Sequence, residues 1–331
     1  MNEMLDYTAF DRSIWESELE NFVPDTVVDV HAHCWDDAYA GDNDGPPCQG
    51  MRYPGGYREL KAHADEIFPG RRNGFALLAV PVPKMDVHGF QAYMGVQVKE
   101  NPLHLGSTAV VPSLSADALD GYIRQYHFTG LKPYRLHAAD PANCRIRDYL
   151  PESQIEVANE HGLTITLHLS RFDGAADKYN QQDLKELTAK YPKVRWILAH
   201  CARGFNPYTL EESVFVLRDL PNIWYDISAV CSTRSHYLLF KHEKLERLFY
   251  GTDNLIAGLD HGSYITWGRG WSFFRGGQMT HCEGAATMVV YEQLRCIKQA
   301  ADMAGLSKSD VEAIFWKNAA AFFGFRKEDI G

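Results

Sequence analysis

Two histidines at the end of an apolar stretch are the residues whose types and spacing most directly suggest chemistry. The run Val27-Val28-Asp29-Val30-His31-Ala32-His33 predicts a β-strand that ends in His-x-His. Side chains at positions i and i+2 of a strand project from the same face. Both rings can therefore reach one ion, and neutral imidazole is the commonest metal ligand in proteins. A His-x-His pair on a surface loop is usually only solvated, so the interpretation depends on whether distant segments repeat the pattern.

Three distant segments repeat this pattern of an apolar run that ends in a functional side chain. Leu163–His168 and Val194–His200 end in histidine, and Arg247–Asp253 ends in aspartate. Each of these side chains follows the carboxyl end of a predicted strand. A single histidine there is more often a core or edge residue with satisfied hydrogen bonds. Four histidines and one aspartate at equivalent strand ends favour one shared site.

The elements that must position these side chains alternate between strand-like and helical patterns. The strand-like segments are Thr26–Val30, Phe75–Val82, Ser107–Val111, Phe128–Tyr134, Leu163–Leu169, Val194–Ala199, Asn222–Ile227 and Arg247–Gly251. The helical segments between them are Val87–Glu100, Ala116–Gln125, Glu152–His161, Gln181–Tyr191, Leu210–Leu220 and Arg234–Glu246. Eight strands that alternate with helices predict an α/β protein of the (β/α)8 TIM-barrel type.

The regions outside this alternation predict an insertion and a helical C-terminal part. Cys34–Gly74 is long and rich in Asp, Gly and Pro, and because it follows the first strand we expect it to cover the barrel mouth as a lid. A Gly- and aromatic-rich loop, Ile256–Gly277, follows the last strand, and two helices near 283–304 and 308–323 end the chain. Ser307 and Asp310 resemble a capping pair, and Gly324 ends the last helix. We expect residues 1–331 to form one domain.

Composition restricts the class of protein. The net charge of −10 argues against a nucleic-acid-binding surface, and the hydrophobic content of 45% allows a large core. The first 24 residues lack the basic start and apolar stretch of a signal peptide, and no apolar run approaches the ~20 residues that span a bilayer. Seven cysteines, an odd number without CxxC spacing, favour reduced thiols and a cytoplasmic location.

Taken together, these motifs resemble the amidohydrolase superfamily, and within it the amidohydrolase-related group that includes aminocarboxymuconate-semialdehyde decarboxylase. The resemblance covers nearly the whole chain. It is carried by His31-Ala32-His33, Gly130-Leu131-Lys132, His168, His200, Gly251-Thr252-Asp253 and Trp316-Lys317-Asn318-Ala319-Ala320. The chain departs from the His-x-Gly-Gly turn that is frequent in the group, because it has His200-Cys201-Ala202-Arg203-Gly204 there.

The resemblance implies a mononuclear metal site with His31, His33, His168 and Asp253 as ligands. Three imidazoles and a carboxylate suit Zn²⁺ with an open position for water, with Mn²⁺ as the alternative ion. Such an ion lowers the pKa of its bound water toward neutrality. His200 would then lie beside that water, orienting it and stabilising negative charge, and Asp253 would accept and later deliver a proton. The alternatives for His200 are a further ligand or a core histidine.

Lys132 and several arginines are the candidates for substrate contact. Lys132 could be carboxylated and bridge two metals, anchor a substrate anion through its free ammonium, or form a structural salt bridge. An arginine fork binds a carboxylate bidentately, so an acidic substrate is expected. The candidate arginines are Arg52, Arg58, Arg71 and Arg72 in the insertion and Arg203 after the strand-6 histidine. Trp35, Tyr57, Trp267 and Trp271 are candidates for the pocket wall.

Three classes of function remain open at this point. The favoured one is a metal-dependent hydrolase that acts on a small, carboxylated lactone, ester or amide. The alternative is a non-oxidative, metal-dependent decarboxylase of an aromatic or muconic-type acid, since the same ligand set serves both reactions. A binding protein without turnover is the third. We expect a small anionic molecule as the partner, neither nucleic acid nor membrane, and leave open whether the chain forms a homodimer.

Overall fold

Eight parallel strands form the centre of the protein. The computed structural model describes residues 5–39, 55–80, 82–254, 256, 258–276 and 284–330. The strands pair in the order of the sequence, each with the next. They are β1 (Thr26–Cys34), β2 (Arg72–Ala79), β3 (Gly106–Val110), β4 (Gly130–Pro133), β5 (Thr164–Leu167), β6 (Arg195–Leu198), β7 (Ile223–Asp226) and β8 (Leu248–Phe249). The predicted strands overlap all eight.

The segment that follows β8 closes the ring against β1. The Val30 amide donates to the Tyr250 carbonyl at 3.1 Å, the Asp253 amide donates to the His31 carbonyl at 2.9 Å, and Ala32 forms a parallel bridge with Asn254. The predicted (β/α)8 barrel is confirmed. This closure also brings the ends of β1 and β8 side by side, and these are the segments that carry the predicted metal ligands.

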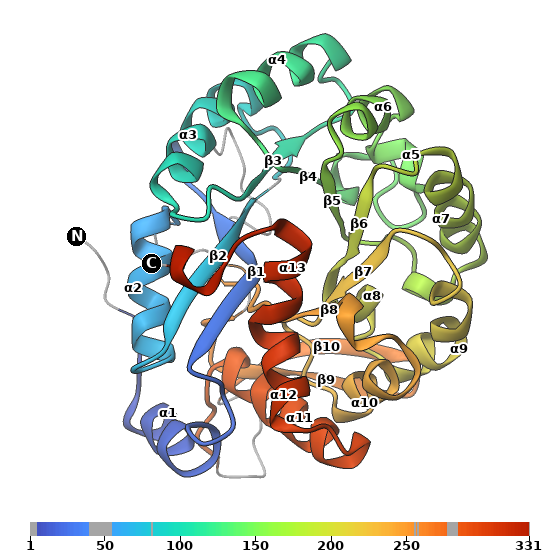
Figure 1. Ribbon diagram of the computed structural model, residues 1–331. Coiled ribbons are helices and arrows are strands. Elements are labelled where there is room, and N and C mark those ends of the chain that lie inside the picture. Colours follow the sequence, from blue (N-terminus) through green and yellow to red (C-terminus); the bar gives the residue numbers. More distant parts are fainter. Residues whose placement is uncertain are drawn as a thin grey trace.

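Helices surround the ring of strands, as Figure 1 shows. They are α2 (Tyr57–Ile67), α3 (Val87–Glu100), α4 (Ala116–Tyr126), α5 (Ile146–Tyr149), α6 (Glu152–His161), α7 (Lys178–Lys190), α9 (Pro207–Leu217) and α10 (Thr233–His242). Side-chain caps explain where several begin: Asp86 accepts from the Gly89 amide at the start of α3, and Ser115 accepts from the Ala118 amide at the start of α4. α3 and α6 have the predicted bounds.

The terminal helices pack against the barrel, and the last of them covers its amino-terminal end. α1 (Ala9–Ile14) precedes the barrel, and α11 (Val289–Ala304), α12 (Lys308–Glu312) and α13 (Asn318–Phe323) follow it. Arg195, the first residue of β6, donates to the carbonyl of Phe322, and the Asn318 amide donates to the carbonyls of Leu245 and Leu248 beside β8. The predicted capping box of Ser307 is confirmed, and Gly324 ends α13 with a left-handed φ of 82°. With this end covered, the cavity must open at the carboxyl ends of the strands.

Two predicted segments differ from the structure. The prediction of a loop at Ile256–Gly277 is wrong, because this segment contains a β-hairpin of β9 (Gly262–Trp267) antiparallel to β10 (Gly270–Arg275). The Asn206 side chain holds the tip of the hairpin by donating to the Gly268 carbonyl at 2.8 Å. The insertion is shorter than Cys34–Gly74, since α2 and the start of β2 belong to the barrel. Most of the remaining lid segment, residues 40–54, lies outside the described residues.

No helix in the described ranges is both long enough and apolar enough to cross a lipid bilayer. The prediction of a single domain over residues 1–331 stays a prediction.

Candidate active site

β1 and the segment after β8 bring three metal-binding side chains together. The Nε2 atoms of His31 and His33 lie 3.2 Å apart, and Asp253 Oδ1 lies 3.4 Å from the first and 3.2 Å from the second. All three side chains are buried. We call His31, His33 and Asp253 the metal-donor group; their ligand atoms all fall within 4.8 Å of one another.

Local backbone features position the side chains of the metal-donor group. The register of β1 against β2 shifts between Asp29 and Ala32, where β1 has one residue more than β2, so His31 lies at a bulge. The Asp29 carboxylate accepts from the His31 amide at 2.9 Å and from the Thr252 amide at 3.0 Å, which ties the two strand ends together. Gly251 allows the close approach, because a Cβ there would lie 2.8 Å from the Cβ of His31.

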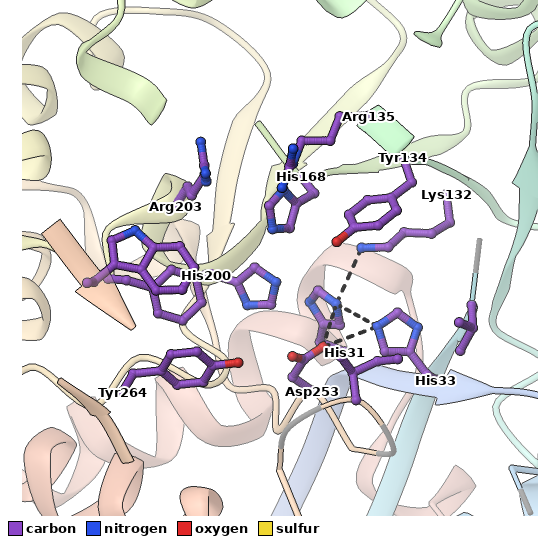
Figure 2. Close-up of a pocket in the computed structure, with 14 residues that line it drawn as sticks. His31, His33, Lys132, Tyr134, Arg135, His168, His200, Arg203, Asp253 and Tyr264 are labelled. Carbon is purple, nitrogen blue, oxygen red and sulfur yellow. Dashed lines mark hydrogen bonds and ion pairs between the residues drawn. The ribbon is translucent and has the colours of Figure 1, made fainter. Parts of the chain in front are cut away.

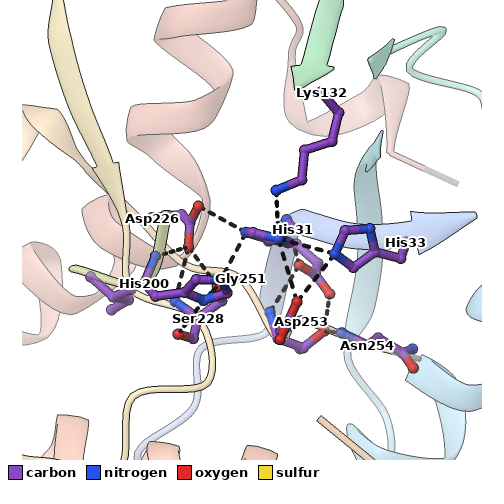
Figure 3. Close-up of polar contacts among 12 residues, drawn as sticks. His31, His33, Lys132, His200, Asp226, Ser228, Gly251, Asp253 and Asn254 are labelled. Carbon is purple, nitrogen blue, oxygen red and sulfur yellow. Dashed lines mark hydrogen bonds and ion pairs between the residues drawn. The ribbon is translucent and has the colours of Figure 1, made fainter. Parts of the chain in front are cut away.

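The hydrogen bonds of the rings show which nitrogen faces the centre. Nδ1 of His33 lies 3.1 Å from the Ala79 carbonyl, and Nδ1 of His31 lies 2.9 Å from an oxygen of Asp226. A carbonyl oxygen or an ionised carboxylate only accepts, so each Nδ1 carries the proton and each Nε2 presents a lone pair. Burial lowers the pKa of both rings, which keeps them neutral. Figure 3 shows Asp226 on the side of His31 that faces away from His33.

This arrangement fits a bound divalent cation. Two unprotonated Nε2 atoms and a carboxylate oxygen repel one another at about 3.3 Å unless a positive charge lies between them. The pKa of Asp253 is lowered to about 2 despite burial, so the carboxylate is ionised. Two imidazoles and a carboxylate are donors that Zn²⁺ and Mn²⁺ both accept. Lys132 lies beside the group, with its Nζ 3.3 Å from His31 Nε2.

The other two predicted histidines face the same cavity from further around the barrel. Nδ1 of His168 lies 3.0 Å from the Leu169 carbonyl, and Nδ1 of His200 lies 3.1 Å from the Ser228 carbonyl, so each again presents an unprotonated Nε2. Burial lowers the pKa of His200 to about 4. His168 does not belong to the set of ligand atoms that all lie within 4.8 Å of one another, and its role as a fourth ligand stays a prediction.

A left-handed turn presents His200. His200, Cys201 and Ala202 have φ values of 57°, 54° and 57°, and Arg203 follows at 62°. Each non-glycine residue in this conformation costs ~1–2 kcal/mol, so the surrounding contacts must hold the turn. The His200 amide donates to Asp226 at 3.1 Å, and the Cys201 thiol lies 3.8 Å from Nδ1 of His236. Asp226 thus orients two of the four histidines.

The cavity between these side chains has a volume of about 160 Å³. Figure 2 shows His31, His33 and Asp253 on one side and His168 and His200 across from them. The remaining lining residues are Val80, Lys132, Tyr134, Arg135, Arg203, Phe205, Ile256, Tyr264 and Trp271. Phe205 stacks on Trp271 with 4.4 Å between ring centroids and lies 4.7 Å from the ring of Tyr264, which makes one wall aromatic.

The predicted substrate residues divide into two sets. Lys132 and Arg203 line the cavity. Three arginines lie elsewhere and do not belong to the site: Arg58 pairs with Glu100 at 3.0 Å on the surface, Arg71 donates to the Val23 carbonyl, and Arg72 begins β2 at the covered end and donates to the Lys327 carbonyl. Arg52 lies outside the described residues.

Among the predicted wall aromatics, only Trp271 lines the cavity. Trp35 is buried in the core, and Trp267 is 57% exposed.

Sequence reasoning missed several residues of the site. Asp226 ends the strand Ile223–Asp226, and the rule that singled out Asp253 would have found it. Arg135 follows Lys132 by three residues at the end of β4, but no pattern distinguishes it from a surface arginine. The position of Phe205 depends on the left-handed turn and that of Tyr264 on the hairpin. Neither the turn nor the hairpin has a periodic signal in the sequence.

Comparisons with known proteins identify the family of the chain. The family model described as Amidohydrolase matches residues 28–325. No curated protein sequence matches the chain.

Several solved structures share the fold. One is 5-carboxyvanillate decarboxylase from Sphingomonas paucimobilis, with a TM-score of 0.55 and 14% identity over 92% of this chain and 100% of that chain. A second is a dihydroxybenzoic acid decarboxylase from Polaromonas sp. JS666, solved with manganese and 2-nitroresorcinol. Its TM-score is 0.56 and its sequence identity 16%, over 92% of this chain and 99% of that chain. A third is a 4-oxalomesaconate hydratase from Rhodopseudomonas palustris, with a TM-score of 0.52 and 12% identity over 90% of this chain and 95% of that chain.

At such low identities the solved structures show the fold alone, whereas the family model covers most of the sequence. The chain belongs to the amidohydrolase family.

Proposed function

We propose that the protein is a metal-dependent, non-oxidative decarboxylase of a small, flat carboxylic acid. The observation that carries the proposal is the cavity of about 160 Å³ with an aromatic wall opposite the metal-donor group. A cavity of ~150 Å³ holds a benzene molecule, so one planar ring or conjugated chain fits. This reverses the order of the two reactions favoured by the sequence alone.

The residues of the chain supply distinct parts of this chemistry. His31, His33 and Asp253 would hold the ion, which when bound polarises a substrate oxygen and disperses negative charge. The ring lies against Phe205 and Trp271, and its carboxylate points toward Lys132 and His200. When the carboxylate leaves as CO₂, the electrons of the broken C–C bond stay on the substrate carbon, and one proton must replace the lost group. Asp253 faces this space and is ionised before the reaction, so we assign it the relay of that proton: it takes the proton from a water in the cavity and passes it to the carbon, and the hydroxide left behind combines with CO₂ as bicarbonate.

Hydrolysis of a lactone, ester or amide is the second candidate. It is favoured by the unprotonated Nε2 of His200, which faces the cavity and can accept a proton from an attacking water.

The names of the solved structures with this fold support the order of the two candidates. Two of them are decarboxylases of aromatic acids and one was solved with manganese. Zn²⁺ remains our proposed ion, with Mn²⁺ as the alternative, and a small anionic acid the proposed partner. The described cysteines are all free thiols, which suits the proposed cytoplasmic location. The oligomeric state stays open.

The test is a screen in which protein reconstituted with Zn²⁺ or Mn²⁺ is incubated with hydroxybenzoic and muconic acids and, separately, with lactones and esters. CO₂ release and proton release are followed in parallel. We expect one CO₂ per molecule of acid consumed, and no turnover by a metal-free control. Proton release from lactones or esters without CO₂ from any acid would establish the hydrolase instead.

A further inference from the structure

Two arginines face the cavity without a carboxylate partner. Arg135 follows β4 in a short turn, and Arg203 ends the left-handed turn after β6. Within residues 5–39, 55–80, 82–254, 256, 258–276 and 284–330, neither forms an ion pair with an aspartate or glutamate. Most arginines of this acidic protein do, as Arg58 does with Glu100. Two cations left unpaired at one cavity indicate that an anion completes the site.

The contacts that these arginines do make hold them in place and leave donors free. The guanidinium Nη1 of Arg135 donates to the Pro141 carbonyl at 2.8 Å, and Nη1 of Arg203 donates to the Arg171 carbonyl. The Arg203 guanidinium also lies over the Trp271 ring, 6.0 Å from its centroid. The Nε atoms of both arginines are buried and have no hydrogen-bond partner in the part of the chain that the structure describes. A buried donor without a partner costs free energy, and a ligand oxygen would remove that cost.

The two guanidinium groups are close enough to influence each other. Burial and then the charge of Arg135 lower the pKa of Arg203 to about 10, which still leaves Arg203 cationic at neutral pH. Like charges that repel each other in a partly buried position are stabilised when an anion binds between them. Arginine is suited to this because its planar fork donates two parallel hydrogen bonds to a carboxylate.

The barrel places these arginines across the cavity from the metal-donor group. β4 and β6 lie on the far side of the eight-strand ring from the junction of β1 and β8. Figure 2 shows Arg135 and Arg203 near His168, on the opposite side from His31, His33 and Asp253. An acid that reacts at the metal-donor group therefore directs its other end toward the arginines.

We propose that Arg135 and Arg203 form an anion subsite that binds a second carboxylate of the substrate, one that is retained in the reaction, so that the substrate is a small dicarboxylic acid. The proposal rests on the proposed function for the position of the reacting carboxylate. Burial of the aromatic ring against Phe205 and Trp271 then sets the distance between the two carboxylates, and a monocarboxylic acid leaves the anion subsite unfilled.

The test measures binding rather than turnover. Isothermal titration of the metal-loaded protein compares isophthalate, a benzene ring with two carboxylates, with benzoate, which has one. We expect isophthalate to bind ~10-fold or more tightly than benzoate, the effect of a hydrogen-bonded charged contact. Arg135→Gln and Arg203→Gln should each remove most of this preference and leave the affinity for benzoate and the metal content unchanged. Arg58→Gln is the matched control, because it removes an arginine outside the cavity.

Equal affinities for the two acids in the wild-type protein, no binding of isophthalate, or a preference that survives both glutamine variants would overturn the anion subsite. If a glutamine variant does not fold, Arg203→Lys keeps the charge but loses the two-pronged donor, and an unchanged preference there would also count against it. A preference for isophthalate without CO₂ release from any acid would support the anion subsite and refute the decarboxylase. CO₂ release without a preference for isophthalate would support the decarboxylase and refute the anion subsite.

Discussion

The metal-donor group on β1 and β8 and the anion subsite after β4 and β6 face each other across one cavity, yet they are built differently. His31 and His33 lie on a strand, and each ring has an oxygen partner that fixes its orientation. Arg135 and Arg203 lie on turns, and their Nε atoms lack partners. The first region is pre-organised to hold an ion. The second depends on loop conformation and selects the substrate, so it can change without disturbing the first.

The largest effect on the two regions is expected when a ligand is removed from the metal-donor group. His31→Ala or Asp253→Ala should lose the metal and all measurable turnover, because two remaining donors do not hold a divalent ion tightly. Metal analysis of the purified variants by mass spectrometry checks this, with Arg58→Gln as the control that keeps both. A variant that retains one ion per chain would show that other residues bind the metal.

A second prediction separates His200, whose ring centroid lies 4.8 Å from that of His31, from the metal ligands. His200→Ala should keep the metal and lower kcat by ~10²–10⁴-fold, because its Nε2 faces the reacting group rather than the ion. Metal content and kcat are measured on the same preparation. Loss of metal in step with kcat would make His200 a ligand.

A smaller effect is expected from the carboxylate behind the metal-donor group. Asp226→Asn removes the negative charge that holds the proton on Nδ1 of His31, and should weaken metal affinity by ~10-fold or more. Competition with a chelator gives the affinity. Ser228→Ala is the matched comparison, since Ser228 also contacts Nδ1 of His31 but carries no charge, and an equal loss in the two variants would contradict a charge effect.

The smallest effect concerns a pair remote from both regions. His261 Nε2 lies 2.8 Å from Asp11, and this hydrogen bond raises the pKa of His261 above 6.5. A raised folded-state pKa stabilises the protein below pH 6.5, and that contribution is lost as the pH rises through the folded-state value. His261→Gln should therefore lower the Tm by about 1–2 °C near pH 5.5 and by less near pH 9. Thermal melts across this range check it, and a difference that grows with pH would contradict it.

The sequence predicted the part of the site that follows strand periodicity. His31, His33, His168, His200 and Asp253 were found because each ends an apolar strand, and parallel strands end at one side of a barrel. Arg135 and Phe205 could not be found this way. Their positions depend on turn conformations, including four consecutive left-handed residues for which the sequence offers no glycine. Arg71 and Arg72 were misplaced because the start of β2 was taken as part of the lid, although it lies at the opposite end of the barrel.

The measurement that tests the account most directly combines metal content with turnover on one preparation. The protein is stripped with a chelator, titrated with Zn²⁺ or Mn²⁺, and assayed for CO₂ release at each step, while intact mass is recorded. We expect activity to rise linearly and to saturate at one ion per chain, without a mass increment on Lys132. Full activity in the stripped protein, or saturation at two ions with a carboxylated Lys132, would contradict the mononuclear centre formed by His31, His33 and Asp253.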